Sequence, residues 1–165
     1  MTDVIRLGED RLPELLQIER ACFSNPWSAQ SLSAALRDPD TVVVGTTDSA
    51  GRLTGYGALK RVLDDGYILN VGVLPAYRRQ GAGAALVSAL LAFAKTQRLA
   101  FVTLEVRRSN AAAIALYQKF GFAAQGIRKN YYSRPVEDAL LMTCRAPFSA
   151  DDATDDLQIK ENADA

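Results

Sequence analysis

The chain has 165 residues, of which 48% are hydrophobic, and equal numbers of basic and acidic side chains give a formal net charge of zero. This length fits one domain that buries about 70% of its extended surface. Histidine is absent, and Cys22 and Cys144 lie far apart, which excludes histidine-dependent zinc sites and histidine-activated nucleophiles. No apolar run is long enough for a membrane span, and the charged N-terminus argues against a secretory signal. We therefore expect a cytoplasmic protein that needs no metal.

The zero net charge hides an uneven distribution along the chain. Residues 149–165 hold six acidic side chains and one basic side chain, a net charge of −5, whereas residues 1–148 hold 18 basic and 13 acidic side chains, a net charge of +5. Because the tail is also poor in apolar residues, we expect a folded domain over 1–148 and an acidic, disordered tail over 149–165. The basic excess of the body suits a polyanionic cofactor and is too weak to argue for nucleic acid.

The first part of the chain predicts a strand, two helices and a hairpin. In chain order these elements are a strand at 4–7, helices at 11–23 and 28–37, and strands at 41–47 and 53–63. Apolar residues in the first helix recur at three- and four-residue spacing, as in an amphipathic helix. Ser28 is placed to cap the second helix, and Pro26 lies in the loop between the two.

A basic, glycine-rich turn joins the next strand to the next helix. The strand at 67–73 ends before Pro75, and the helix at 81–96 begins within the turn Arg78-Arg79-Gln80-Gly81-Ala82-Gly83. The first N–H groups of a helix have no intrahelical partner and lie at the positive end of its dipole, so they attract phosphate. Gly81 and Gly83 lack the Cβ atoms that would keep a pyrophosphate away. An ordinary turn with solvated arginines is the alternative.

A second strand and helix follow this turn. Residues 101–106 form a predicted strand, Asn110 is placed to cap a helix that runs through Phe120, and Gly121 suits the left-handed residue after its last turn. The chain closes with strands at 123–127 and 138–145 around the segment 130–136. Strands and helices in this order predict a mixed α/β sheet.

In these two segments the chain resembles the GNAT superfamily of acyl-coenzyme A-dependent N-acetyltransferases. Arg78–Gly83 matches the pyrophosphate loop of the superfamily, and the Asn-capped helix with its Leu116-Tyr117-x-x-x-Gly121-Phe122 ending matches the downstream half. The resemblance implies the GNAT fold, in which the strands at 67–73 and 101–106 splay apart and acyl-CoA enters between them. It implies acetyl-CoA as the cosubstrate.

Within the superfamily, the chain is similar to the RimI-type enzymes, which acetylate the N-terminal alanine of a small-subunit ribosomal protein. The similarity runs from about residue 4 to Arg145. The stretches that carry it are Asn25–Ser28, Leu104–Tyr117, Arg128–Tyr132 and Glu137–Ala139. The resemblance thus implies a protein N-terminus as the partner, with neither nucleic acid nor membrane. The breadth of substrates and the oligomeric state stay open.

The resemblance assigns the chemistry to two side chains. Glu105 shares a strand face with Phe101 and Thr103, and RimI-like enzymes place a catalytic glutamate at this motif position. Glu105 would act as general base, directly or through water, on an amine that attacks the thioester carbonyl. Tyr117 would protonate the departing CoA thiolate. Without the resemblance, a solvated strand-end glutamate paired with an arginine is the favoured interpretation of Glu105, and an aromatic side chain at the edge of the core is the alternative for Tyr117.

The same resemblance implies the binding residues, some of which would equally serve packing. We expect the cofactor to be bound by Val71, Gly72, Val73, Arg78, Arg79, Gln80, Gly81, Ala82, Gly83, Ala84 and Asn110. The main chain of the first three would hold the pantetheine arm. We expect the substrate to be bound by Trp27, Tyr131, Tyr132 and Asp138, with Phe23, Pro26 and Glu137 beside them. Glu137 and Asp138 could face a basic second residue of the substrate.

Two other functions stay open from the sequence. A GNAT enzyme could acetylate lysine side chains or a small amine, and the Tyr131-Tyr132 pair with Glu137–Ala139 argues against this by its similarity to protein N-terminal acetyltransferases. The chain could also be a catalytically silent acyl-CoA-binding module. The presence of both Glu105 and Tyr117 argues against that alternative.

Overall fold

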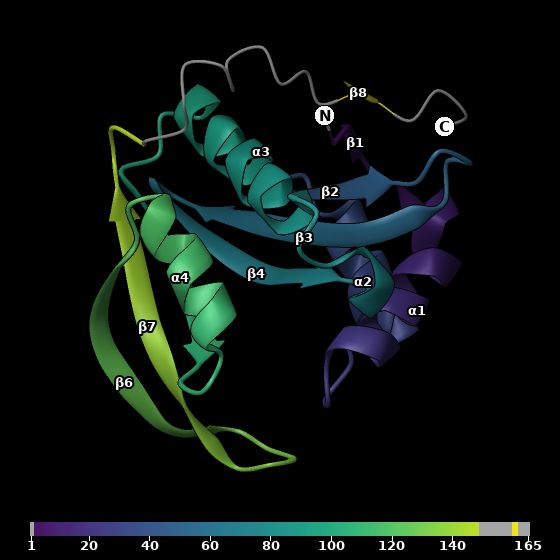
Figure 1. Ribbon diagram of the computed structural model, residues 1–165. Coiled ribbons are helices and arrows are strands. Elements are labelled where there is room, and N and C mark those ends of the chain that lie inside the picture. Colours follow the sequence, from purple (N-terminus) through teal and green to yellow (C-terminus); the bar gives the residue numbers. More distant parts are fainter. Residues whose placement is uncertain (1, 149–159, 162–165) are drawn as a thin grey trace.

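The computed structural model describes residues 2–148 and 160–161, and its strands form one sheet in the order β6-β7-β5-β4-β3-β2-β1-β8 (Figure 1). The strands are β1 (Val4–Arg6), β2 (Thr41–Thr47), β3 (Leu53–Val62), β4 (Asp65–Val73), β5 (Phe101–Arg107), β6 (Ala123–Tyr132), β7 (Glu137–Arg145) and β8 (Lys160–Glu161). The helices are α1 (Leu12–Cys22), α2 (Ala29–Arg37), α3 (Ala82–Thr96) and α4 (Ala111–Lys119), with short 3-10 turns η1 (Glu9–Arg11) and η2 (Pro75–Tyr77).

The sheet is mixed, and its central pair of strands separates. β4 pairs in parallel with β5 over only three positions, where Asp65–Tyr67 lies beside Phe101–Thr103. A register shift between β3 and β4 leaves Leu69 without an opposite residue, and such bulges bend and twist a strand. Beyond Tyr67, β4 continues along β3 while β5 continues along β7. The predicted splayed strands and mixed α/β fold are confirmed.

Helices cover both faces of the sheet and enclose two hydrophobic clusters. One cluster joins α3 and α4 to the sheet and includes Leu86, Leu90, Leu104 and Met142. The other lies under α1 and α2 and includes Leu15 and Ile18 from α1. Figure 1 shows α3 and the α1–α2 pair on opposite sides of the strands. Among the described residues, no helix is long and apolar enough to cross a membrane.

The expected helix caps are confirmed. Ser28 Oγ accepts a hydrogen bond from Ser31 N at 3.1 Å, and Asn110 Oδ1 accepts one from Ala113 N at 3.2 Å. Each satisfies an N–H group of the first helical turn that would otherwise lack a partner. Gly121, after α4, has φ +90°, the left-handed conformation expected there.

The largest departure from the predicted elements is at β6. The sequence predicts a strand that ends at Ile127, but β6 continues to Tyr132, and β7 begins at Glu137. The pairing with β7 shifts register between Arg128 and Tyr132, and Asn130 adopts φ 54° within this irregular stretch. A polar sequence therefore stays in the strand because a left-handed residue absorbs the bulge. Two smaller differences are that β4 begins two residues earlier, at Asp65, and β5 ends one residue later, at Arg107.

Most of the acidic segment 149–165 lies outside the described residues. The exception is β8, whose backbone pairs in parallel with β1, Lys160 beside Ile5 and Glu161 beside Arg6. The expected division into a folded domain over 1–148 and a disordered tail over 149–165 stays a prediction.

Candidate active site

β4 presents main-chain groups at the edge that β5 leaves. Leu74 N donates to Thr54 O at 2.8 Å, across to β3. Because main-chain groups of successive strand residues point to alternate edges, the amides and carbonyls of Val71 and Val73 point away from β3. The carbonyl of Val73 accepts hydrogen bonds from Cys22 Sγ at 3.3 Å and Arg78 Nε at 2.8 Å. No strand of the described part of the chain pairs with this edge past Tyr67, so an extended ligand can hydrogen-bond there as an added strand.

Gly72 lies between these two residues and serves a close contact within the protein. A Cβ at Gly72 would lie 3.1 Å from the Phe23 ring and 3.3 Å from Cys22 Cβ. The missing side chain thus lets the end of α1 pack against β4. This contact fixes where the loop between α1 and α2 begins. Binding of the cofactor by the Gly72 main chain stays a prediction.

The glycine-rich turn has the geometry of an open helix start. Gly81 caps α3 with φ +86°, and a Cβ there would meet nothing within 4 Å. Ala85 N donates to Gly81 O at 3.0 Å, so the amides of residues 82–84 precede the first bond of the helical ladder. Arg78, Arg79 and Gln80 are exposed. An anion can therefore approach both the amides and the guanidinium groups.

Gly83 has a second role beside this turn. A Cβ on Gly83 would lie 3.2 Å from Leu116 Cδ2, so the glycine allows α4 to approach the first turn of α3. Asn110, at the start of α4, is exposed and caps that helix. The structure thus places both residues in helix packing and capping, and their contacts with the cofactor stay predictions.

Glu105 faces the side of the sheet that carries α1 and α2. Val102, Leu104 and Val106 belong to the cluster beneath α3 and α4, so strand alternation turns Glu105 to the opposite face. Its side chain is 21% exposed, and Oε1 lies 3.3 Å from Arg128 Nε on β6. An ion pair this open to solvent contributes little to stability. The carboxylate is partly accessible to solvent, and its role as the base stays a prediction.

Tyr117 is buried on α4, with 7% of its surface exposed. Its ring meets Phe122 edge to face, with centroids 5.7 Å apart. Burial, and then the neighbouring Tyr132, raise the pKa of its phenol. None of the described residues hydrogen-bonds the hydroxyl. A phenol is protonated at neutral pH in any case, so Tyr117 has a proton to give, and its role as the general acid stays a prediction.

The charge of Glu105 acts on the phenols of Tyr131 and Tyr132. Their rings meet edge to face with centroids 5.0 Å apart. Burial, then Tyr131, then Glu105 raise the pKa of Tyr132 to about 12, and burial followed by Glu105 raises the pKa of Tyr131. Tyr131 is 52% exposed, whereas Tyr132 is half-buried. Tyr131 therefore has exposed surface, and substrate binding by Tyr131 and Tyr132 stays a prediction.

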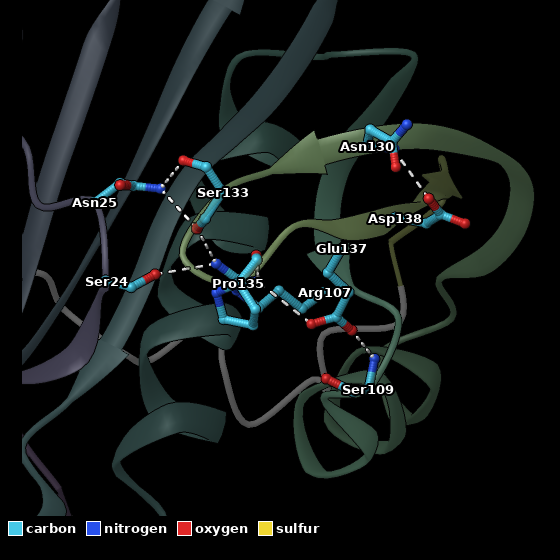
Figure 2. A network of polar contacts seen from close by, with 9 residues as sticks. All are labelled: Ser24, Asn25, Arg107, Ser109, Asn130, Ser133, Pro135, Glu137 and Asp138. Atoms are coloured by element: carbon cyan, nitrogen blue, oxygen red, sulfur yellow. Dashed lines mark hydrogen bonds and ion pairs between the residues drawn. The ribbon is translucent and has the colours of Figure 1, made fainter.

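The two acidic residues at the start of β7 already have protein partners (Figure 2). Asp138 Oδ1 accepts a hydrogen bond from Asn130 N at 2.9 Å, and Glu137 Oε2 accepts one from Ser109 N at 2.6 Å. Hydrogen bonds from Ser109 and the guanidinium of Arg107 hold the pKa of Glu137 below its ordinary value. Glu137 is thus occupied within the fold, and substrate binding by Asp138 stays a prediction.

Trp27 is half-buried against the cluster under α1 and α2. With Ser31 and Leu69 it lines a hollow of about 430 Å³ on that side of the sheet. Its main-chain N donates to Glu19 Oε2 at 2.9 Å. Packing accounts for its position, and contact with a substrate stays a prediction.

Glu19 is a buried residue that sequence reasoning missed. It has no exposed surface, and its Oε1 accepts hydrogen bonds from the Tyr56 hydroxyl and from Asn70 Nδ2, the latter at 2.8 Å. The signal was present, because Glu19 follows Leu15 by four residues and Ile18 by one, on the buried face of α1. A charged residue on such a face indicates a polar network inside the fold.

Among the described residues, no group of three histidine, cysteine, aspartate or glutamate side chains is placed to hold a metal ion.

Comparison with known proteins agrees with this geometry. Residues 12–122 match the Acetyltransferase (GNAT) family. The chain belongs to the GNAT family. This GNAT chain is 34% identical over 144 residues to the ribosomal protein bS18-alanine N-acetyltransferase of Escherichia coli K12, covering 86% of this chain and 96% of that protein. The crystal structure of the Escherichia coli enzyme superimposes with a TM-score of 0.81, covering 88% of this chain and 94% of that one.

A further relative of this GNAT chain is the N-alpha-acetyltransferase RimI of Mycobacterium tuberculosis, 37% identical over 122 residues that cover 72% of this chain and 75% of that protein. The structure of Arabidopsis thaliana NAA60 in complex with acetyl-CoA has a TM-score of 0.81 at 21% identity and covers 88% of this chain and 99% of that one, which shows a shared fold.

Proposed function

We propose that this GNAT chain transfers the acetyl group of acetyl-CoA to the N-terminal α-amine of a protein, the N-terminal alanine of a small-subunit ribosomal protein. The observation that carries the proposal is its similarity to the Escherichia coli bS18-alanine N-acetyltransferase, which extends through both halves of the site. The proposed substrate also places the reaction in the cytoplasm, where ribosomes are assembled.

The acetyl-CoA site follows from the separated strands. The turn at Gly81 and the amides that open α3 would hold the pyrophosphate, since a helix start attracts anions. The edge of β4 at Val71 would hydrogen-bond the pantetheine arm. Both contacts use main-chain groups, so they orient the cosubstrate with little dependence on side chains.

The proposed chemistry is direct attack by the amine on the thioester carbonyl. Glu105 takes a proton from the amine, directly or through water, and the nitrogen forms a bond to the carbonyl carbon. The carbon–sulfur bond then breaks, and Tyr117 gives its proton to the thiolate. The products are the N-acetylated chain and free CoA, with no covalent enzyme intermediate.

The choice of an α-amine is favoured by its acidity. An α-amine has a pKa near 7.7 to 8.0, so about one in ten is neutral at pH 7, whereas lysine, near 10.4, is neutral only a few times in ten thousand. Glu105 is partly exposed and has Arg128 beside it. A carboxylate in this setting is suited to an amine that is already partly neutral and needs only a weak base.

The peptide would approach Glu105 along two neighbouring segments. One is the α1–α2 loop, residues 23–28, and the other is the turn between β6 and β7, residues 133–136. Asn25 Nδ2 donates to Ser133 O at 3.0 Å, so the two segments touch. Tyr131 and Tyr132 lie at the end of β6 beside this contact.

The test is mass spectrometry of synthetic peptides incubated with the protein and acetyl-CoA. Three peptides share one sequence: the first begins with alanine, the second with serine or methionine, and the third has a blocked N-terminus and an internal lysine. We expect acetylation of the alanine peptide and none of the blocked one, with the Glu105→Gln variant as the control for enzyme-dependent transfer. Faster acetylation of the blocked peptide would contradict the proposal and favour a lysine acetyltransferase, and no transfer to any peptide would favour a small-amine substrate or a silent acyl-CoA-binding module.

A further inference from the structure

Arg107 occupies a special place relative to the proposed base. It is the last residue of β5, two positions after Glu105, so both side chains project from the same face of the sheet. The β5–β7 pairing is regular over this stretch, with Glu105 beside Leu141 and Arg107 beside Ala139. A change at Arg107 therefore acts close to the reaction centre.

The guanidinium of Arg107 joins both segments that flank the peptide path (Figure 2). Nη1 donates to Pro135 O at 3.0 Å and lies 3.3 Å from Glu137 Oε1. Nη2 donates to Ser24 Oγ at 3.0 Å and to Ser133 O at 2.9 Å. One side chain thus connects β5, the α1–α2 loop and the β6–β7 turn, and its contact with Ser24 spans 83 residues of sequence.

Two further contacts lock this arrangement. Asn25 Nδ2 donates to Ser133 O at 3.0 Å and to Ser133 Oγ at 2.8 Å, a second link between loop and turn. Glu137, which contacts Arg107 through Oε1, accepts the main-chain N–H of Ser109 through Oε2 at 2.6 Å. The turn is therefore fixed both to the loop and to the segment that precedes α4.

The geometry requires arginine rather than a positive charge alone. The guanidinium carbon lies 4.6 Å from the centre of the Tyr132 ring, while both terminal nitrogens meet acceptors. A planar fork can stack on a ring and donate in several directions at once, whereas an ammonium group is a compact point charge. Arg107 is 22% exposed and Glu137 is 19% exposed, so the pair is largely shielded from solvent.

We propose that Arg107 is a positioning residue that sets the distance between the α1–α2 loop and the β6–β7 turn and thereby the affinity for the peptide. This inference rests on the proposed function. Both terminal nitrogens are engaged with protein acceptors, so Arg107 acts through the loop, the turn and Tyr132 rather than by touching the substrate. The binding of acetyl-CoA, on the β4 side, does not depend on it.

The test is steady-state kinetics of Arg107→Met and Arg107→Lys with the alanine-starting peptide. We expect Arg107→Met to raise the peptide KM by about 10-fold to 100-fold, because misplacement of substrate-positioning groups is this costly. The KM for acetyl-CoA should stay unchanged and kcat should fall much less. Arg107→Lys should give an intermediate peptide KM. The control is Arg52→Met, which removes an 81% exposed guanidinium in the turn between β2 and β3 and should leave both constants unchanged.

Two independent measurements keep the test decisive. The double variant Ser24→Ala, Asn25→Ala removes the loop's side of the contact without altering β5, and it should raise the peptide KM in the same direction. Amide hydrogen exchange should become faster in residues 23–27 and 132–136 of Arg107→Met, because local opening follows the loss of contacts. Exchange is read without substrate, so it separates a failure of this proposal from a failure of the proposed function.

An unchanged peptide KM in both Arg107→Met and the double variant would overturn the proposal. So would wild-type kinetics in Arg107→Lys, since a charge alone would then suffice, or an equal rise in the KM for acetyl-CoA. If Arg107→Met does not fold, the double variant and its exchange pattern decide the question.

Discussion

The β4 side and the β5 side of the site are built from different chemical groups. On the β4 side the proposed contacts come from the main chain, at the edge of Val71 and Val73 and at the first turn of α3. On the β5 side they come from side chains, with Glu105 on β5 and Tyr117 on α4. A main-chain surface is altered by an added Cβ, whereas a side-chain surface is altered by replacing one atom. Substitutions on the β5 side should therefore lower turnover, and substitutions on the β4 side should weaken the binding of acetyl-CoA.

On the β5 side, the largest loss of activity is expected from Glu105→Gln. We expect turnover to fall by about 10²- to 10⁴-fold, because a neutral amide cannot accept the proton of the amine. Affinity for acetyl-CoA, measured by calorimetric titration, should stay near wild type.

The matched control for Glu105→Gln is Arg128→Gln, which removes the same ion pair from its other end. Since exposed pairs contribute at most about 1 kcal/mol, turnover should change less than about fivefold. If the two variants lost activity equally, Glu105 would serve the ion pair and would not be the base.

Tyr117→Phe tests the acid on the same side. We expect turnover to fall by about 10²-fold or more, because the thiolate would leave without a proton donor. None of the described residues hydrogen-bonds the Tyr117 hydroxyl, so the thermal midpoint should stay close to wild type. Calorimetry and peptide kinetics together check this. Full turnover in a folded Tyr117→Phe protein would assign the tyrosine to packing against Phe122.

The same contrast explains what the sequence could predict. The elements of the β4 side can be predicted from the sequence because they depend on local features. These features are a strand that ends before Pro75, glycines in the turn and an apolar helix after it. The caps at Ser28 and Asn110 are also local, and both predictions are confirmed. Short-range chemistry of this kind can be predicted from spacing alone.

The side-chain network could not be predicted in this way. Asn25 and Ser133, which are 108 residues apart, meet only because β6 continues past Ile127 through the left-handed Asn130. Residues 128–132 are mostly polar, so they show no alternation of apolar and polar side chains from which to predict that the strand continues. Arg107 belongs to the recognised motif, but its partners cannot be assigned from sequence because they lie on two other segments.

Glu19 joins the β4 side to the α1–α2 loop. It accepts hydrogen bonds from Asn70 on β4 and from the main chain of Trp27 in the α1–α2 loop. Glu19→Leu would leave the Trp27 amide and the buried Tyr56 hydroxyl without their acceptor, whereas Asn70 Nδ2 would keep its bond to the Tyr56 oxygen at 3.2 Å. At about 1 to 3 kcal/mol for an unsatisfied buried donor, we expect a loss of about 2 to 4 kcal/mol in the free energy of unfolding.

Chemical denaturation of Glu19→Leu checks this loss, and Glu19→Gln is its control because the amide oxygen still accepts a hydrogen bond. Glu19→Gln should be the more stable of the two. Equal stability of both variants with the wild type would mean that water replaces the carboxylate, and the network would not hold the α1–α2 loop against β4.

On the β4 side, Gly81→Val tests the proposed pyrophosphate site. A side chain there would project into the open space in front of the α3 amides and would disfavour φ +86°. We expect the Kd for acetyl-CoA to rise by about tenfold or more, which corresponds to at least about 1.4 kcal/mol. Calorimetric titration measures it, and turnover at saturating acetyl-CoA should change less.

Gly51→Val is the matched control for this prediction. Gly51 has φ +83°, and a Cβ there would likewise meet nothing within 4 Å, but this glycine lies in the β2–β3 turn. Gly51→Val should carry a similar backbone cost and leave the affinity for acetyl-CoA intact. Equal losses of affinity in both variants would trace the effect to general destabilisation and would move the phosphate site elsewhere.

The smallest effect is expected from truncation after Phe148, whose side chain is buried. The removed segment is polar and acidic, with little apolar area to offset the entropy of ordering. We expect the melting temperature and peptide acetylation to stay nearly unchanged, although the two-residue pairing of β8 with β1 is lost.

The competing idea is that the tail, with its charge of −5, screens the body, with its charge of +5, at the cofactor or peptide site. Such attraction weakens with salt, because the screening length falls to about 10 Å at 0.1 M ionic strength. Michaelis constants for acetyl-CoA and the alanine-starting peptide, measured at low and high salt with and without the tail, separate the two ideas. A marked drop of one constant at low salt on truncation would identify the tail as an inhibitor, and the constant that drops would tell which side it covers.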